Sequence, residues 1–388
     1  MTRTVAAIAL ALIAATGCAA AQEVTIGYLG LADDPRYDPK IAYTRIELTP
    51  AGNPVDGARM GIADLKVVAD AVGQVIRLDQ QEAADAAALT AKLGEMVAAG
   101  EQFIILDLPA ELVDQVAAAA KNLPATLINA TAPDDYLRNR CYPNLLHTAA
   151  SDRMTADALV QYLRTRNWTR VLMLVGPEAR DTAMAQAFRA AAERQRLNIV
   201  DERRFTLAAD PANREQNNTL LITGNADYDV VYVADEQGEF ARYLPYATQL
   251  PRPVIGSTGL VASEWHWGFE RYGAPQVTSR FADSAGGRRM AGQDWSTWMA
   301  AKAIATAYAK AGGTDYDEAA AYLRSRRLRL DGSKGVQLSF RPWDGQMRMP
   351  ITLSTHNAVI AVAPLEGFLH QTNTLDTLGT DEPEHRCE

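Results

Sequence analysis

The sequence predicts an α/β protein with two doubly wound parallel-sheet lobes joined by a multi-crossover hinge. The chain has 388 residues, which is more than one hydrophobic core usually supports, so two domains are expected. Short apolar runs alternate with amphipathic segments, and a second series of this kind begins near Ser151. Strands that alternate with helices predict parallel sheets that are covered by helices on both faces.

The first series of alternating elements lies between residues 22 and 148. Strands are predicted at residues 24–30, 75–78, 103–108, 125–129 and 144–148. Helices are predicted at residues 57–72 and 83–99 and after Pro109. Apolar residues recur at helical spacing in these segments, and proline is favoured at the first position of a helix.

The second series predicts the other lobe. Helices are predicted at residues 151–166, 181–196, 219–223 and 238–249, with Ser151 as the N-cap of the first. Strands are predicted at residues 170–175, 199–205, 229–234 and 253–256. We therefore expect a second parallel sheet of the same kind as the first.

The rest of the chain holds too few elements for a third lobe. Helices are predicted at residues 294–311 and 317–326, and strands at residues 336–340, 351–354 and 359–362. These must complete the two lobes, so lobe 1 is predicted at 22–148 plus about 265–330, and lobe 2 at about 149–260 plus 336–363. The crossings are expected near 148–151, 256–265 and 330–336. Several crossings make a hinge, and a cleft between hinged lobes is the usual ligand site.

The first 21 residues are predicted to be a signal peptide rather than part of the fold. Arg3 precedes an apolar run at 5–15 that is too short to span a bilayer, and small residues at 19–21 favour cleavage before Gln22. The alternative is lipoprotein processing with a lipid anchor on Cys18. No later apolar run reaches about 18 residues, so the mature chain is not expected to span a membrane.

Two cysteines remain after cleavage, Cys141 and Cys387. In an exported protein such a pair most simply forms a disulfide, which would tether a polar C-terminal tail, residues 364–388, to the body. The alternative is two inert thiols.

Composition and motifs favour a binding protein over an enzyme. The net charge is −9 and is mixed along the chain, whereas nucleic-acid-binding proteins show a basic patch and a high isoelectric point. The histidines lack metal-ligand spacing, and the sequence has no CxxC pair, phosphate loop or nucleophile elbow. We therefore expect no catalytic residue, no metal and no required cofactor.

The loops that follow the predicted strands point to a ligand site. In open parallel sheets, ligands lie outside the carboxyl ends of the strands. Arg36 and Tyr37 follow the first strand, Asp107 ends the third, and Asn129 ends the fourth. These four residues are candidate ligand-binding residues of lobe 1.

A second group of candidates lies between residues 265 and 302. They are Arg288, Arg289, Trp265, Trp267, Trp295, Trp298 and Lys302. Fixed positive charge beside aromatic surface suits a planar, anionic small molecule. Trp295 is expected at the start of a helix that Asp294 caps, close to the cleft, whereas Trp298 is better explained as a core residue. The alternative for the two arginines is a solvated surface pair.

Several segments resemble the type I periplasmic solute-binding proteins of ABC transporters, of the branched-chain amino acid-binding class. The similarity is most specific at residues 146–154, and residues 228–234 and 331–340 also match. The resemblance implies a two-lobe fold, a periplasmic location and an ABC transporter permease as a partner. Asp107-Leu108-Pro109 departs from the small polar turn of that class, which argues against an α-amino acid as the ligand.

Other segments resemble a narrower group, the substrate-binding proteins associated with PQQ-dependent alcohol dehydrogenase systems. They are residues 265–276, 287–290, 294–300 and 373–379. This resemblance implies pyrroloquinoline quinone (PQQ), a planar tricarboxylate, as the ligand. The alternatives are another small solute of alcohol metabolism, or a sensor or cofactor-delivery role for a PQQ-dependent dehydrogenase.

Overall fold

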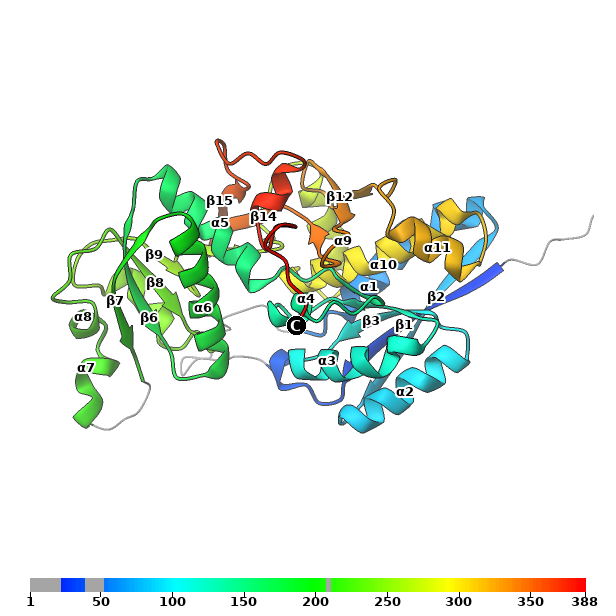
Figure 1. Ribbon diagram of the computed structural model, residues 1–388, viewed down its shortest axis with the longest axis horizontal. Coiled ribbons are helices and arrows are strands. Elements are labelled where there is room, and N and C mark those ends of the chain that lie inside the picture. The colour runs from blue at the N-terminus through cyan, green and yellow to red at the C-terminus, as the bar shows by residue number, and fades with distance from the viewer. Residues whose placement is uncertain (1–21, 39–51, 207–210) are drawn as a thin grey trace, which may run out of the picture.

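The computed structural model describes residues 22–38, 52–206 and 211–388. Figure 1 shows two α/β bodies side by side, with the green elements of the second body on the left and the blue and cyan elements of the first on the right. The predicted signal peptide and Cys18 lie outside the described residues.

Lobe 1 contains a five-stranded parallel sheet in the order β2-β1-β3-β4-β5. Its strands are β1 (Gln22–Leu31), β2 (Gln74–Ala83), β3 (Phe103–Asp107), β4 (Thr126–Asn129) and β5 (Leu145–His147). The helices between them and after β4 are α1 (Val55–Ala71), α2 (Ala86–Ala98), α3 (Ala110–Ala119) and α4 (Tyr136–Asn139).

Lobe 2 contains a four-stranded parallel sheet in the order β7-β6-β8-β9. Its strands are β6 (Arg170–Val175), β7 (Asn198–Arg204), β8 (Val230–Ala234) and β9 (Val254–Gly256). Its helices are α5 (Asp152–Thr165), α6 (Ala179–Arg194), α7 (Arg214–Asn217) and α8 (Thr219–Ile222). Ser151 caps α5 as predicted, because its hydroxyl accepts a bond from the Met154 N–H at 3.3 Å. The predicted fold class is confirmed.

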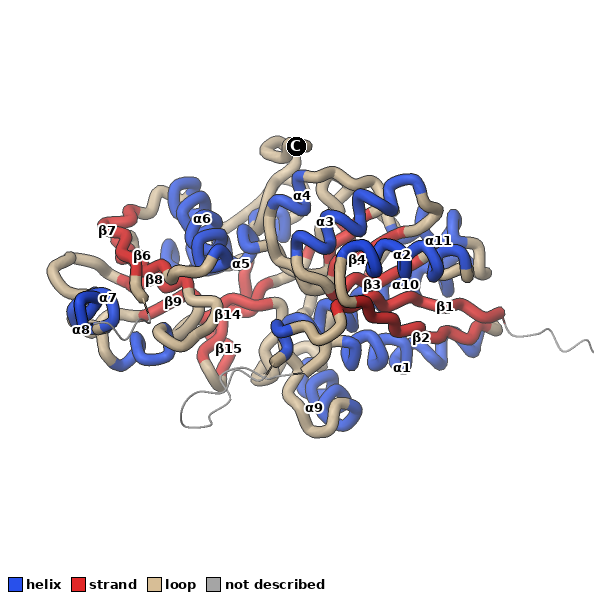
Figure 2. Tube along the Cα trace, turned by 90° about the horizontal axis from the view of Figure 1, so that it is seen from below, coloured by secondary structure: helices blue, strands red, loops and turns tan. Residues whose placement is uncertain are grey.

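The later strands do not join these two sheets as predicted. They form two antiparallel three-stranded sheets of their own. One holds β10 (Val261–Ser263), β14 (Ile351–Thr355) and β15 (Ala358–Ala363), and the other holds β11 (Leu330–Asp331), β12 (Gln337–Phe340) and β13 (Met347–Arg348). Short connections let β11, β12 and β13 pair in succession, and β14 pair with β15, without a crossover helix, whereas β10 pairs with β14, which is distant in the chain. In Figure 2, β14 and β15 lie between the two bodies.

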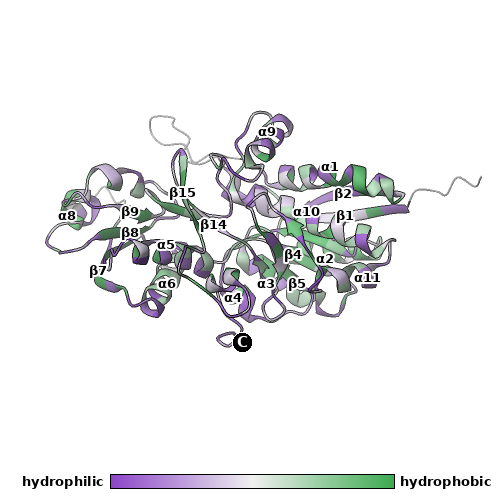
Figure 3. Cartoon of the chain, turned by 90° about the horizontal axis from the view of Figure 1, so that it is seen from above, coloured by the Kyte–Doolittle hydropathy of each residue, from purple (hydrophilic) through white to green (hydrophobic). Residues whose placement is uncertain are grey.

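The central strands of the lobe 1 sheet, β3 and β4, are buried on both faces. On β3, Ile104 and Leu106 pack in the same cluster as residues of α2 and α3, whereas Phe103 and Ile105 pack with residues of α1 and α10 (Gly292–Ala311). Strands β8 and β9 of lobe 2 are correspondingly hydrophobic, as their green ribbons in Figure 3 show, whereas the edge strands β2 and β7 are more polar. This is the pattern expected of parallel sheets covered by helices on both sides.

Helices α1 and α10 approach each other closely. A Cβ atom on Gly57 of α1 would lie 2.0 Å from the main-chain oxygen of Asp294, so only glycine fits there. Asp294 is not the N-cap of α10 as predicted. The N-cap is Ala291, and Asp294 is the third residue of the helix. Its carboxylate accepts a hydrogen bond from the Ala291 N–H at 2.8 Å. Two further helices, α9 (Ala274–Ser284) and α11 (Tyr316–Leu323), flank α10 in the chain.

The C-terminal tail is fastened to the body, and the predicted disulfide between Cys141 and Cys387 is confirmed. It links the loop after α4 to the penultimate residue of the chain. Among residues 22–38, 52–206 and 211–388, no helix combines the length and the apolar character needed to cross a membrane.

Candidate functional site

The carboxyl ends of β1, β3 and β4 bring three predicted residues together. Arg36 and Tyr37 follow β1, and both reach Asp107 at the end of β3. The Arg36 Nη2 atom lies 3.1 Å from Asp107 Oδ1, and the Tyr37 hydroxyl donates a hydrogen bond to the same oxygen. We call this group the Arg36 site. Its members are Tyr28, Asp34, Arg36, Tyr37, Asp107 and Thr131.

Asp107 is the acceptor at the centre of the Arg36 site. The hydroxyls of Tyr28 and Thr131 each donate to it at 2.9 Å, in addition to Arg36 and Tyr37. Its side chain is only 3% exposed. Burial raises the pKa of Asp107, while the Arg36 charge and the hydroxyl donors act in the opposite direction. The carboxylate is therefore satisfied by the protein, and its donors are fixed in place.

Arg36 is the cation of the site. Asp34 binds it through Nε at 2.8 Å and Nη2 at 2.6 Å, and the Arg36 Nη1 donates to Thr131 at 3.2 Å. Burial lowers the pKa of Arg36, but Tyr37 and the two carboxylates outweigh it and the net shift is upward. The side chain is 28% exposed, so a fixed positive charge is partly accessible at this edge of the sheet.

Asn129 is the fourth candidate from the predicted strand ends, and it holds the loop that follows β4 beside the Arg36 site. Its side chain is buried, accepts the N–H of Ala132 at 3.0 Å and donates to the Ala132 carbonyl at 2.8 Å. Its amide nitrogen also lies 3.1 Å from His147 Nδ1. Burial lowers the pKa of His147, so the neutral ring accepts this bond. Asn129 thus shapes the loop that carries Thr131, and its direct contact with a ligand stays a prediction.

A second arginine-centred group, which the sequence did not single out, links the lobes. Arg180, at the start of α6, pairs with Asp152 at the start of α5 and lies 3.8 Å from Asp134 of lobe 1. Burial raises the pKa of Asp152 to about 6, against the opposing effect of Arg180. Arg180 closely follows the end of β6 in the chain, but its partners Asp152 and Asp134 lie 28 and 46 residues earlier.

The structure places Trp295 and Trp298 in the core, which corrects the expectation that Trp295 lies at a cleft. Trp295 is 0% exposed, its Nε1 donates to the Gly332 carbonyl at 3.1 Å, and the Lys334 ammonium sits 3.8 Å from its ring centre. Trp298 is also buried, and its Nε1 donates to Asp64 at 3.0 Å. Both indoles have partners inside the protein, so we do not include them in the proposed site.

Lys302 and Arg288 are likewise engaged by the protein. Lys302 donates to the Asp331 carbonyl at 2.6 Å and lies 4.7 Å from the centre of the Trp298 ring. Arg288 binds two carboxylates, Asp294 at 2.7 Å and Asp56 at 3.2 Å, and its side chain is 13% exposed. Arg288 therefore connects the first turns of α1 and α10.

Trp267 and Arg289 keep the predicted combination of aromatic surface and charge. The Arg289 guanidinium is exposed and lies 3.8 Å from the ring centre of the half-buried Trp267. The neighbouring Trp265 is buried and meets Phe269 edge-on. Of the seven candidates between residues 265 and 302, this pair alone resembles the surface that a flat anion needs.

Comparisons with known proteins agree with this architecture. Residues 78–253 match the family model described as the receptor family ligand binding region. A search of curated proteins finds no significant match.

Solved structures of binding proteins share the fold. An ABC transporter substrate-binding protein from Sphaerobacter thermophilus is 15% identical with a TM-score of 0.71, covering 88% of this chain and 98% of that one. A periplasmic binding protein from Burkholderia mallei is 15% identical with a TM-score of 0.66, covering 95% and 99%. A solute binding protein of an ABC transporter from Rhodopseudomonas palustris BisB5, in complex with 3,4-dihydroxybenzoic acid, is 15% identical with a TM-score of 0.64, covering 86% and 93%. The chain therefore has the two-lobe periplasmic binding protein fold.

Proposed function

We propose that this protein is a periplasmic solute-binding protein that captures a small molecule between its lobes for ABC-type transport. The observation that carries the proposal is the Arg36 site, a partly accessible cation at the carboxyl edge of a parallel sheet. Ligands of open α/β sheets lie at that edge. The solved structures of similar fold are named as binding proteins, which supports a binding role rather than catalysis.

The charge of the Arg36 site favours a ligand with one carboxylate. Arg36 faces two carboxyl groups, Asp34 and Asp107, which neutralise it and disfavour a ligand with several negative charges. Its Nη1 group makes a bond only to Thr131 among the described residues, which leaves one of its two N–H donors for a ligand oxygen. We therefore propose a small monocarboxylic acid. The Rhodopseudomonas palustris protein in complex with 3,4-dihydroxybenzoic acid is a relative in fold that supports this choice.

PQQ is the second candidate, and one observation favours it. Arg289 stacked on Trp267 offers the accessible charge and ring that a planar tricarboxylate needs. A sensing role, or delivery of PQQ to a dehydrogenase, would rest on the same contact. Titration of the protein with PQQ tests the binding step that all of these roles require.

The test is a calorimetric titration of ligand-free protein with 3,4-dihydroxybenzoate, leucine and PQQ. We expect 3,4-dihydroxybenzoate, the aromatic monocarboxylate, to bind. Arg36→Met should weaken its binding about 10- to 100-fold, which is the loss expected for a hydrogen bond to a charged group. The matched control, Arg289→Met, should bind the monocarboxylate like the unchanged protein.

The other outcomes are equally decisive. If PQQ alone binds, and Arg289→Met rather than Arg36→Met weakens it, the second candidate replaces the first. If mass spectrometry of the native protein finds no co-purified small molecule and none of the three ligands binds, solute capture at this site is rejected.

A further inference from the structure

The end of the C-terminal tail is held in place by more than its disulfide. The N–H of Gly379 donates to Asp157 of α5 at 2.8 Å, and Glu384 forms an ion pair with Arg153 of the same helix. The N–H of Glu388 donates to the carbonyl of Asn139 in α4 at 2.8 Å. Residues on both sides of Cys387 are therefore anchored, and the tail would remain beside Cys141 if the disulfide were opened.

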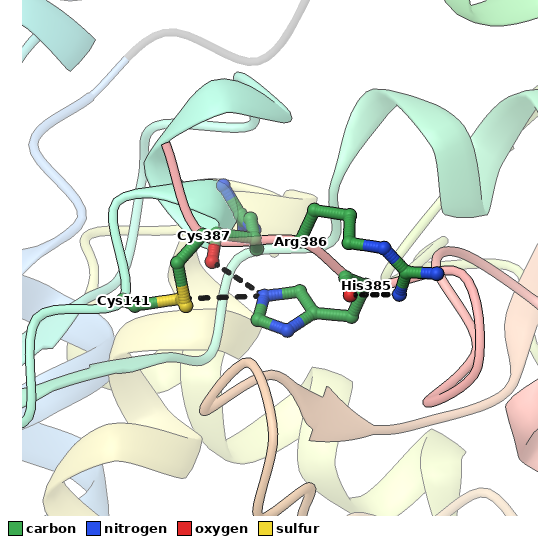
Figure 4. Close-up of a disulfide and its surroundings, with 5 residues drawn as sticks. Cys141, His385, Arg386 and Cys387 are labelled. Atoms are coloured by element: carbon green, nitrogen blue, oxygen red, sulfur yellow. Dashed lines mark hydrogen bonds between the residues drawn. A yellow bond between two sulfur atoms is a disulfide. The ribbon is translucent and has the colours of Figure 1, made fainter.

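Three metal-ligating side chains meet where the tail ends. The sulfurs of Cys141 and Cys387 and a ring nitrogen of His385 all lie within 4.8 Å of one another. Figure 4 shows the His385 imidazole turned toward the disulfide, with its Nε2 atom 3.7 Å from Cys141 Sγ. In a tetrahedral zinc site, bond lengths of about 2.3 Å to sulfur and about 2.0 Å to nitrogen separate these two ligand atoms by about 3.5 Å. The histidine is therefore already at ligand distance from one sulfur.

We propose that the reduced thiols of Cys141 and Cys387, together with His385, bind a Zn²⁺-type ion that replaces the disulfide as the closure of the tail. A dithiol supplies the two electrons: the sulfur–sulfur bond breaks, each sulfur takes up a proton, and the dithiol becomes a disulfide. Zn²⁺ then displaces both thiol protons, which pass to water. The disulfide and the metal both use the sulfur atoms of Cys141 and Cys387, so they exclude each other.

His385 changes partner in this step. Its Nε2 atom lies 3.1 Å from the Arg138 carbonyl, to which it donates when the proton is on that nitrogen. Zinc takes the Nε2 lone pair, so the ring proton moves to Nδ1. A cavity of about 320 Å³, lined by all three ligand residues and by Trp343 and Arg341, gives water access to the fourth position of the ion.

The experiment uses the full mature chain, reduced with a phosphine, desalted and titrated with Zn²⁺ against a chromophoric chelator. We expect one Zn²⁺ per reduced chain and none per oxidised chain. Titration with Cd²⁺ should give the ultraviolet charge-transfer band of a cadmium thiolate. His385→Gln should weaken Zn²⁺ binding more than about tenfold, because even outer-shell partners of a metal are worth about 10- to 100-fold.

His370→Gln is the matched control, because His370 lies on the same tail but pairs with Asp381 at 3.0 Å. It should bind Zn²⁺ like the unchanged chain. Circular dichroism of the reduced protein confirms that it is folded. The proposal is overturned if the folded, reduced chain binds no Zn²⁺, if the oxidised chain binds it equally well, or if His385→Gln and His370→Gln behave alike.

Discussion

Two arginines of this protein are each held by two aspartates, and their surroundings differ. Arg288 joins the first turns of α1 and α10, and its side chain is 13% exposed. Arg36 lies at the carboxyl edge of the lobe 1 sheet, and its side chain is 28% exposed. The pairing alone therefore does not identify a ligand site. The two arginines differ in location: the Arg288 guanidinium lies in a contact between two helices, whereas the Arg36 guanidinium lies at a sheet edge that ligands can reach.

The largest expected effect on stability concerns Trp295, which lies in the same helix contact region as Arg288. Trp295→Ala should lower the free energy of unfolding by about 3–5 kcal/mol, because it empties a fully buried site between α10 and Gly332. The urea denaturation midpoint measures this loss. Ligand affinity of the folded fraction should not change.

Trp267→Ala is the control for that substitution. The indole is half-buried and meets Arg289 at the surface, so we expect a loss of less than about 1 kcal/mol. If Trp295→Ala were to abolish ligand binding while leaving the urea midpoint unchanged, Trp295 would belong to the ligand site and the comparison would be reversed.

The second prediction concerns Arg288 itself. Arg288→Met should lower the free energy of unfolding by about 2–3 kcal/mol, since it leaves the nearly buried Asp294 without its cation. Arg289→Met, one residue away, should change it by less than about 0.5 kcal/mol because the side chain is exposed. Equal urea midpoints for the two variants would contradict the structural role of Arg288.

The fold was predictable because its signal is local. Apolar runs such as 103–107 are buried on both faces and read as parallel strands, and helix starts such as Ser151 carry their own cap. The late strands were expected to complete the two lobes, but they form two sheets of their own, because pairing partners are not a local property of the sequence. A short connection lets β14 and β15 pair with each other as a hairpin rather than join a parallel sheet.

The site was predictable in part for the same reason. The rule on strand ends found Arg36, Tyr37 and Asp107, whose positions depend on the topology of the sheet. The Arg288 segment was misread because its partner Asp56 is 232 residues away in the sequence. Nothing local shows that α1 covers α10, so Arg288 and Trp295 were expected at an accessible surface, whereas Trp298 was correctly expected in the core.

The third prediction uses pH to test how His147 supports the Arg36 site. Burial lowers the pKa of His147, so the unfolded chain binds a proton below about pH 6.5 that the folded chain does not. The contribution of His147 to the free energy of unfolding should therefore fall as pH drops below about 6.5, by up to about 1.4 kcal/mol per pH unit, whereas the raised pKa of Asp152 acts in the opposite direction. This contribution is fully present above that pH.

Urea unfolding at a series of pH values measures the slope. His147→Gln should remove the His147 part of the slope, whereas His370→Gln on the tail should leave that part in place. An unchanged slope in His147→Gln would show that other groups govern the acid lability, and that the bond between Asn129 and His147 does not support the loop beside Arg36.

The smallest expected effect on stability belongs to Arg36. Arg36→Met should lower the free energy of unfolding by about 1 kcal/mol or less. The Arg36 side chain is partly solvated, and protonation of Asp107 can compensate for the lost positive charge. Asp107 keeps three hydroxyl donors, and burial already raises its pKa, so the carboxyl takes up a proton when the cation is removed. The same variant should lose about 10- to 100-fold in monocarboxylate affinity. Urea denaturation and calorimetry on one preparation therefore give opposite rankings for Arg36→Met and Arg288→Met. If both measurements ranked the two variants in the same order, the sheet edge would have no special role, and the accessible charge of Arg36 would be as structural as that of Arg288.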